Sequence, residues 1–171
     1  MLYLDIDGVL NPDVDGVPRL HKADFANDDW PDFKHHEIDI HKGGGLVLRF
    51  HIHLSKLLGD ALWDATGGNI TWHTTWTQDN LANREVGPRL GWTSLPSLPY
   101  FGEPADGKWW KWNELLATDL PDRWVWVDDD LVRNPEAVAW AKDNGGLTIS
   151  PSSERGLTPP LIEAIGRYLN D

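Results

Sequence analysis

The sequence predicts an α/β protein: a doubly wound parallel sheet with helices on both faces, in a single domain over residues 1–171. Short apolar runs between turn residues recur along the chain, as strands buried on both faces of a parallel sheet do. Helical patterns separate these runs, and strands that alternate with helices are typical of right-handed parallel crossovers. The predicted strands are residues 2–6, 69–73, 124–127 and 147–149.

Five helices are expected between and after these strands. Residues 54–65 carry apolar side chains at a helical period, and residues 77–90 are polar and amphipathic up to Gly91. Two further helices begin with a capping residue followed by proline, the usual pattern of a helix start. The predicted helices are residues 54–65, 77–90, 109–117, 135–143 and 159–169, the last two preceded by the caps Asn134 and Thr158.

Residues 13–53 fit neither pattern and are predicted to be an insertion between the first strand and the first helix. The first part is acidic and polar and is expected to be a loop. The second part, with residues 35–41 and 46–53 around Gly43–Gly45, is expected to be a β-hairpin. We expect the insertion to form a small flap beside the functional site.

Composition excludes several classes of function. The chain has no cysteine, so disulfides, thiolate metal sites and cysteine catalysis are ruled out. A net charge of −12 argues against binding along an extended nucleic-acid backbone, because that binding depends on Lys and Arg. No apolar run is long enough to cross a membrane and no signal segment opens the chain, so a cytoplasmic protein without membrane contact is expected. Most of the 11 tryptophans, including Trp109 and Trp110, are expected in the core, with base stacking as the alternative for that pair.

Several histidines lie in the predicted hairpin, where they raise the question of a metal site. Zinc requires three or four converging ligands, and no spacing along this sequence requires such convergence. We therefore expect hairpin surface residues or substrate contacts. These histidines are His35, His36, His41, His51 and His53.

Two aspartates lie at the end of the first predicted strand. Asp5 and Asp7 are spaced i and i+2, which places both carboxylates on one side of the chain if the strand continues that far. Two like charges held so close repel each other, so the site is expected to bind a cation or to raise one pKa. Gly8 then begins a turn that Pro12 follows. This pattern is typical of a catalytic site.

The other predicted strands deliver oxygen ligands to the same edge of the sheet. Thr74 and Thr75 follow the second strand, and Asp128 and Asp129 follow the third, where Asp130 extends the acidic run. Active sites of parallel α/β sheets form where strands release their carboxyl ends. Carboxylates that converge there suit Mg²⁺. The hydroxyl and backbone N–H groups suit the oxygens of a phosphoryl group.

Together, these motifs resemble the haloacid dehalogenase (HAD) superfamily, and more narrowly the small HAD domains of "Swiss-army-knife" RNA-repair proteins. The resemblance covers most of the chain outside residues 13–53. It rests on residues 5–12, 72–76 with Ala82 and Asn83, 126–130 and 156–158. It implies a HAD-like Rossmannoid fold with the hairpin flap instead of a large cap.

The resemblance also implies catalytic roles. Asp5 would be the nucleophile that attacks phosphorus, and Asp7 would be the general acid and base, with its backbone carbonyl on Mg²⁺. Thr74 would hydrogen-bond a phosphoryl oxygen. A lysine would balance the charge of the intermediate; Lys111 is expected there, with Lys108 as the alternative.

Metal and substrate contacts are implied as well. Asp128 and Asp129 would hold Mg²⁺ together with Asp5 and Asp7. Contacts to the substrate are expected from residues around the site: Gly8, Thr75, Lys108 and Arg155.

The expected function is therefore Mg²⁺-dependent hydrolysis of a phosphomonoester through an aspartyl-phosphate on Asp5. The substrate is expected to be a phosphorylated molecule, with a nucleotide or a nucleic-acid terminal phosphate as candidates. Two alternatives use the same residues: a non-catalytic Mg²⁺-dependent module that binds a nucleotide or a protein, and a phosphotransferase.

Overall fold

The computed structural model describes residues 1–12, 27–41, 43–102, 104 and 108–171. The predicted acidic loop at residues 13–26 lies outside the described residues. A four-stranded parallel sheet has the order β4-β1-β5-β6, which confirms the α/β prediction. Its strands are β1 (Leu2–Leu4), β4 (Ile70–Trp72), β5 (Trp124–Val127) and β6 (Gly146–Ile149). That the whole chain forms one domain stays a prediction.

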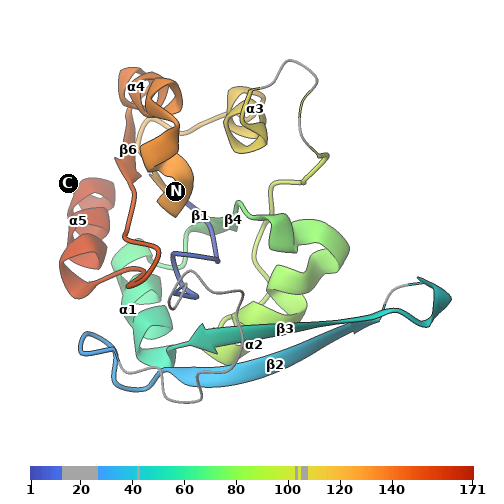
Figure 1. Ribbon diagram of the computed structural model, residues 1–171. Helices are drawn as coiled ribbons and strands as arrows, with labels where there is room; N and C mark the ends of the chain where they lie inside the picture. The colour runs from blue at the N-terminus through green and yellow to red at the C-terminus, as the bar shows by residue number, and fades with distance from the viewer. Residues whose placement is uncertain (13–26, 42, 103, 105–107) are drawn as a thin grey trace.

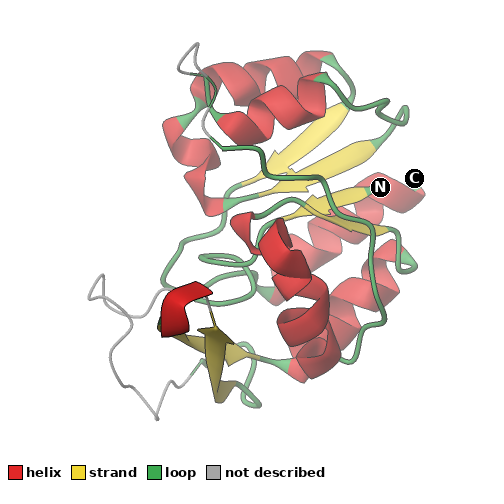
Figure 2. Ribbon diagram, turned by 90° about the vertical axis from the view of Figure 1, so that its right-hand side faces the viewer, coloured by secondary structure: helices red, strands yellow, loops and turns green. Residues whose placement is uncertain are grey.

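Helices cover both faces of this sheet (Figures 1 and 2). One face packs against α1 (Lys56–Thr66) and α5 (Pro159–Asn170), which also contact each other. The other face packs against α3 (Trp110–Leu116) and α4 (Pro135–Asp143). The strands are therefore buried on both sides, as their continuous apolar runs predicted.

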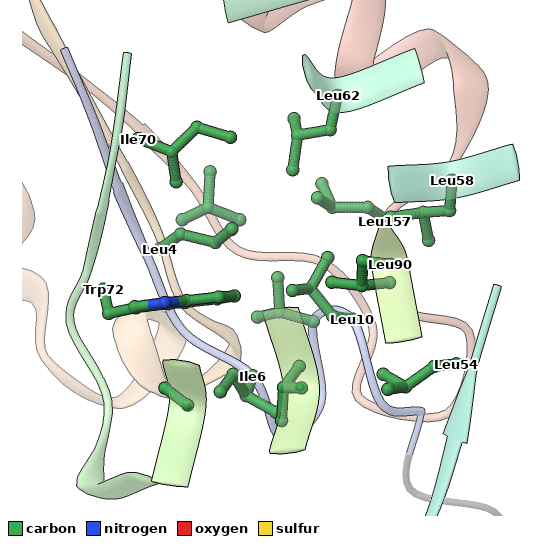
Figure 3. Packing of buried hydrophobic residues seen from close by; sticks show 14 of the residues in the cluster. Leu4, Ile6, Leu10, Leu54, Leu58, Leu62, Ile70, Trp72, Leu90 and Leu157 are labelled. Carbon is green, nitrogen blue, oxygen red and sulfur yellow. The ribbon is translucent and has the colours of Figure 1, made fainter. Parts of the chain in front are cut away.

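Alternate residues of β1 and β5 supply the two cores. On the α1 and α5 side, Leu4 and Ile70 pack with Leu58 and Leu62 (Figure 3). On the opposite side, tryptophan side chains dominate. Seven of the 11 tryptophans are buried and the other four are half-buried, which agrees with their prediction as packing residues. The buried ones are Trp30, Trp72, Trp76, Trp92, Trp110, Trp124 and Trp126.

The helix predicted over residues 77–90 is present only in its second part, residues 81–90. This region forms a 3₁₀ segment (Thr75–Asn80), a π-helical turn (Ala82–Val86) and the short α2 (Gly87–Leu90). Asp79 and Asn80 break the regular path, because both have positive φ, at 52° and 56°. Asn83 then bonds to distant groups: it accepts from the Trp72 indole at 3.0 Å and from Leu95 N–H at 2.9 Å. These tertiary bonds override the amphipathic pattern.

The predicted hairpin is present as a separate two-stranded sheet, with β2 (Lys34–His41) antiparallel to β3 (Val47–Leu54). It projects from the body of the domain (Figure 1). A 3₁₀ turn over Gly43–Gly45 lies near its tip. The face with Ile38 and Ile52 is buried, while the opposite face carries histidines and charged residues. Across the described residues, no helix combines the length and apolar character needed to cross a membrane.

Candidate functional site

The candidate site lies where β1 and β5 end side by side. Asp5 follows β1 directly, and its backbone N–H donates to the Val127 carbonyl at 3.1 Å. Asp128 follows β5 in the same way and donates to Ile149 at 3.1 Å. These ladder bonds place both aspartates at one edge of the sheet. A pocket of about 340 Å³ opens there, lined by Asp5, Asp7, Gly8, Thr75, Trp109, Trp110, Lys111, Asp129, Asp130, Arg133 and Ser153.

Asp5 and Asp7 share this pocket for a reason that differs from the predicted one. Strand β1 ends at Leu4, not at Ile6, so strand alternation does not align the two carboxylates. A tight turn does so: the N–H groups of Leu10 and Asn11 both donate to the Ile6 carbonyl at 2.9 Å. The turn brings Asp7 back to the pocket that Asp5 lines.

Gly8 is required in that turn by both backbone angle and space. Its φ is +71°, a conformation that side chains rarely adopt, and a Cβ there would lie 2.3 Å from Asp129 Cγ. Gly8→Ala is therefore expected to lower the free energy of unfolding by about 1–3 kcal/mol. It is also expected to displace Asp129 and weaken Mg²⁺ binding roughly 10-fold, measured by calorimetry.

Gly44→Ala is the matched control for Gly8→Ala. Gly44 has a similar φ of +76°, but a Cβ would meet no atom within 4 Å. Gly44→Ala should lower the free energy of unfolding through backbone strain alone and leave Mg²⁺ affinity unchanged. If Gly8→Ala bound Mg²⁺ with wild-type affinity, the expectation that Asp129, the neighbour of Gly8, holds the ion would be refuted.

Lys111 is the lysine that reaches the two buried aspartates. Its Nζ lies 2.7 Å from Asp5 Oδ2 and also donates to Asp128 Oδ2, and all three side chains are buried. The alternative, Lys108, is exposed; its Nζ lies 5.9 Å from the ring centre of Trp112, in a neighbouring pocket. Of the two candidates, the structure places only Lys111 between the carboxylates.

The carboxylates outnumber the cation at this point. Oxygens of Asp5, Asp128 and Asp129 lie within 4.8 Å of one another, whereas the side chain of Asp7 is not in that group. Burial raises the pKa of Asp5 and, more strongly, that of Asp128; burial and the Asp5 charge raise the pKa of Asp129 to about 6. Burial lowers the pKa of Lys111, but the carboxylates of Asp5 and Asp128 outweigh it and raise that pKa overall. A divalent cation would balance the remaining negative charge, and three carboxylates suit Mg²⁺.

Asp7 is held by two donors that the sequence analysis did not identify. Asn11 Nδ2 donates to Asp7 Oδ1, and the Trp76 indole N–H donates to Asp7 Oδ2, each at 2.8 Å. Asn11 Oδ1 in turn accepts the N–H of His53 at 2.8 Å, which ties the hairpin to this carboxylate. The two bonds fix the orientation of Asp7 toward the pocket.

Comparison with known families agrees with this geometry. A family model described as "HAD domain in Swiss Army Knife RNA repair proteins" matches residues 1–162. The chain belongs to this family. No curated protein and no solved structure matched it significantly. The resemblance inferred from the motifs is confirmed.

The remaining predicted contacts of the HAD site divide into two groups. Thr75 lines the pocket, whereas Thr74 is buried, is not among the lining residues, and caps the next helical turn, where it accepts from the Trp76 N–H at 3.4 Å. Arg155 is not among the described residues that line the pocket; it pairs with Asp29 at 2.6 Å.

The rim of the HAD pocket carries a cation that the sequence analysis missed. Arg133 lines the pocket and is exposed, and it pairs with Asp130 at 3.0 Å. Asp130 is not in the group of three clustered carboxylates. No described residue of the hairpin lines the pocket, although Phe50 packs against Trp76 with ring centres 5.4 Å apart. The described hairpin therefore borders the site without closing it.

Proposed function

We propose that this HAD domain is a Mg²⁺-dependent phosphomonoester hydrolase that acts through an aspartyl-phosphate on Asp5. One observation carries the proposal: Asp5 is a buried carboxylate at the base of a polar pocket, paired with Lys111 at 2.7 Å. Asp7 lines the same pocket in a fixed orientation, so a nucleophile and a proton-transfer group face one space.

Asp5, Asp128 and Asp129 would hold the Mg²⁺ ion, with the backbone carbonyl of Asp7 as a further ligand. The ion would offset the negative charge of the phosphoryl oxygens beside these carboxylates. Burial raises the pKa of all three carboxylates, and Asp5 adds to the rise at Asp128 and Asp129, so a bound cation that stabilises their charged forms supports this assignment.

In the proposed first step, a carboxylate oxygen of Asp5 attacks phosphorus and the bond from phosphorus to the leaving oxygen breaks. Asp7 donates a proton to that leaving oxygen, which departs as an alcohol. In the second step, Asp7 takes a proton from water as the water attacks the phosphorus of the aspartyl-phosphate. Inorganic phosphate leaves and the Asp5 carboxylate is restored.

Lys111 remains protonated through both steps and stabilises charge that develops on the phosphoryl oxygens next to Asp5. Its raised pKa supports a permanently charged ammonium. Thr74 and Thr75 are proposed as hydrogen-bond donors to the same oxygens, and Thr75 is the one exposed in the pocket.

The proposed substrate is a phosphorylated nucleotide or nucleic-acid end. Trp109 and Trp110 line the pocket beside the carboxylates, and Arg133 adds a cation at its rim. Trp109 and Arg133 also line a neighbouring pocket of about 360 Å³, which offers space for a group attached to the phosphate. The net charge of −12 favours recognition of an end over binding along a strand.

The test is hydrolysis of an aryl phosphate, followed by nucleotides and 3′- or 5′-phosphorylated oligonucleotides, with Mg²⁺ and with EDTA. We expect turnover with Mg²⁺ and its loss in EDTA, restored by added Mg²⁺. Mg²⁺ binding without turnover on any substrate would refute hydrolysis and favour a binding module. Transfer of phosphate to an added alcohol or nucleoside in preference to water would favour a phosphotransferase.

A further inference from the structure

The hairpin face opposite Ile38 and Ile52 gathers four side chains of types that bind metals. His35 pairs with His53 across the two strands, and Glu37 pairs with His51 in the next position of the register. Residues spaced by two share one face of a strand, and cross-strand partners lie close together. All four side chains therefore project from the same side of β2 and β3, opposite the buried isoleucines.

The ligand atoms of three of these residues already converge. His35 Nε2 lies 3.0 Å from His51 Nδ1, and His51 Nδ1 lies 3.9 Å from Glu37 Oε1. All three ligand atoms lie within 4.8 Å of one another. Tetrahedral Zn²⁺ with bonds near 2.0–2.1 Å requires ligand atoms roughly 3.3 Å apart, a value that the two distances bracket.

A further histidine lies beside this group. The ring of His53 is 5.2 Å from that of His35, centre to centre, and His53 is buried at the base of the hairpin. His35 and His51 stack in parallel, also 5.2 Å apart. Three imidazoles and one carboxylate form a nitrogen-rich set, which suits Zn²⁺ and not Mg²⁺.

The neighbouring charges orient the carboxylate. Arg49 forms a two-point ion pair with Asp39, at 2.7 and 2.8 Å, and its Nη1 lies 3.5 Å from Glu37 Oε2. The other oxygen of Glu37 is the one nearest His51. Arg49 is largely offset by Asp39, so the face keeps a negative charge on Glu37 toward the histidines.

We propose that His35, Glu37 and His51, with His53 as the fourth ligand, form a Zn²⁺ site that stabilises the hairpin. The site is separate from the carboxylates around Asp5 and does not depend on the proposed hydrolase function. Binding needs each imidazole in the tautomer that carries its proton on the nitrogen away from the metal. The hydrogen bond between His35 and His51 would give way to the shared ion.

The test uses the full chain, stripped with EDTA and then dialysed against Zn²⁺ with excess Mg²⁺ to occupy the carboxylate site. We expect one bound Zn²⁺ per chain by elemental analysis and a rise in thermal stability. Co²⁺ in place of Zn²⁺ should give the visible absorption of a tetrahedral nitrogen-ligand site, a readout that needs no variant. Absence of both bound Zn²⁺ and this spectrum would overturn the proposal.

Variants locate the ion. Glu37 is exposed, so Glu37→Gln should cost no packing. Combined with His51→Gln, it should weaken Zn²⁺ binding at least 10-fold. His36→Gln is the matched control, because His36 lies on the other face of the same strand, and it should leave binding unchanged. Asp128→Asn should also leave the hairpin ion in place. Loss of Zn²⁺ in Asp128→Asn with retention in the hairpin variant would assign the ion to the carboxylate site and refute the proposal.

Discussion

Asp5→Asn is expected to lower kcat by at least about 10³-fold with Mg²⁺ saturating, because the amide cannot form the aspartyl-phosphate. The fold should persist. Asn keeps the shape of the side chain. Burial raises the pKa of Asp128 and the charge of Asp5 raises it further, so removal of that charge relieves repulsion between the two side chains. The measurement is steady-state hydrolysis of an aryl phosphate, with thermal unfolding followed in parallel.

The control for Asp5→Asn is Asp143→Asn, the same chemical change at an exposed position at the end of α4. It should keep wild-type kcat and stability. Turnover in Asp5→Asn within a few-fold of wild type would remove Asp5 as the nucleophile. Trapping of phosphate on wild-type protein after acid quench, and its absence in Asp5→Asn, would support the assignment independently.

The strands and most helices could be predicted because their signals are local. Continuous apolar runs marked the four parallel strands, and Asn134 followed by Pro135 marked the start of α4 at the residue observed. The irregular start of residues 77–90 could not be predicted in this way. Its shape depends on hydrogen bonds that Asn83 accepts from the Trp72 indole and the Leu95 N–H, and such bonds leave no periodic trace in the sequence.

The same distinction applies to the site. The positions of the carboxylates could be predicted because they lie at the ends of recognisable strands, and Lys111 could be preferred over Lys108 because it lies within a predicted helix, which is α3 in the structure. Their catalytic roles stay predictions. The donors that hold Asp7 could not, because Trp76 is read from the sequence as an apolar residue and only the fold directs its indole N–H to that oxygen. The cluster of His35, Glu37 and His51 depends on the strand register, which determines which residues face each other across the hairpin.

Lys111→Met is expected to lower the free energy of unfolding by about 3–5 kcal/mol near pH 8 without Mg²⁺, because it leaves two buried carboxylates without their cation. The loss should depend on pH. Burial raises the pKa of Asp5 and Asp128 above their values in the unfolded chain, so folding favours their protonated forms. The destabilisation should therefore be small near pH 4, which is about the pKa of aspartate in the unfolded chain, and should grow as the pH rises. Urea unfolding at pH 5 and pH 8 measures this difference.

Three comparisons make the Lys111→Met result specific. Lys108→Met removes an exposed lysine from the same segment and should change stability by less than about 0.5 kcal/mol. Asp128→Asn introduced into Lys111→Met should recover part of the lost stability, because one fewer buried charge then lacks a partner. Added Mg²⁺ should also recover part of it, because the ion supplies positive charge to the same carboxylates. If Lys111→Met were as stable as wild type at pH 8 without Mg²⁺, the site would not depend on Lys111 for charge balance, and the assignment of this lysine to the phosphoryl intermediate would fail with it.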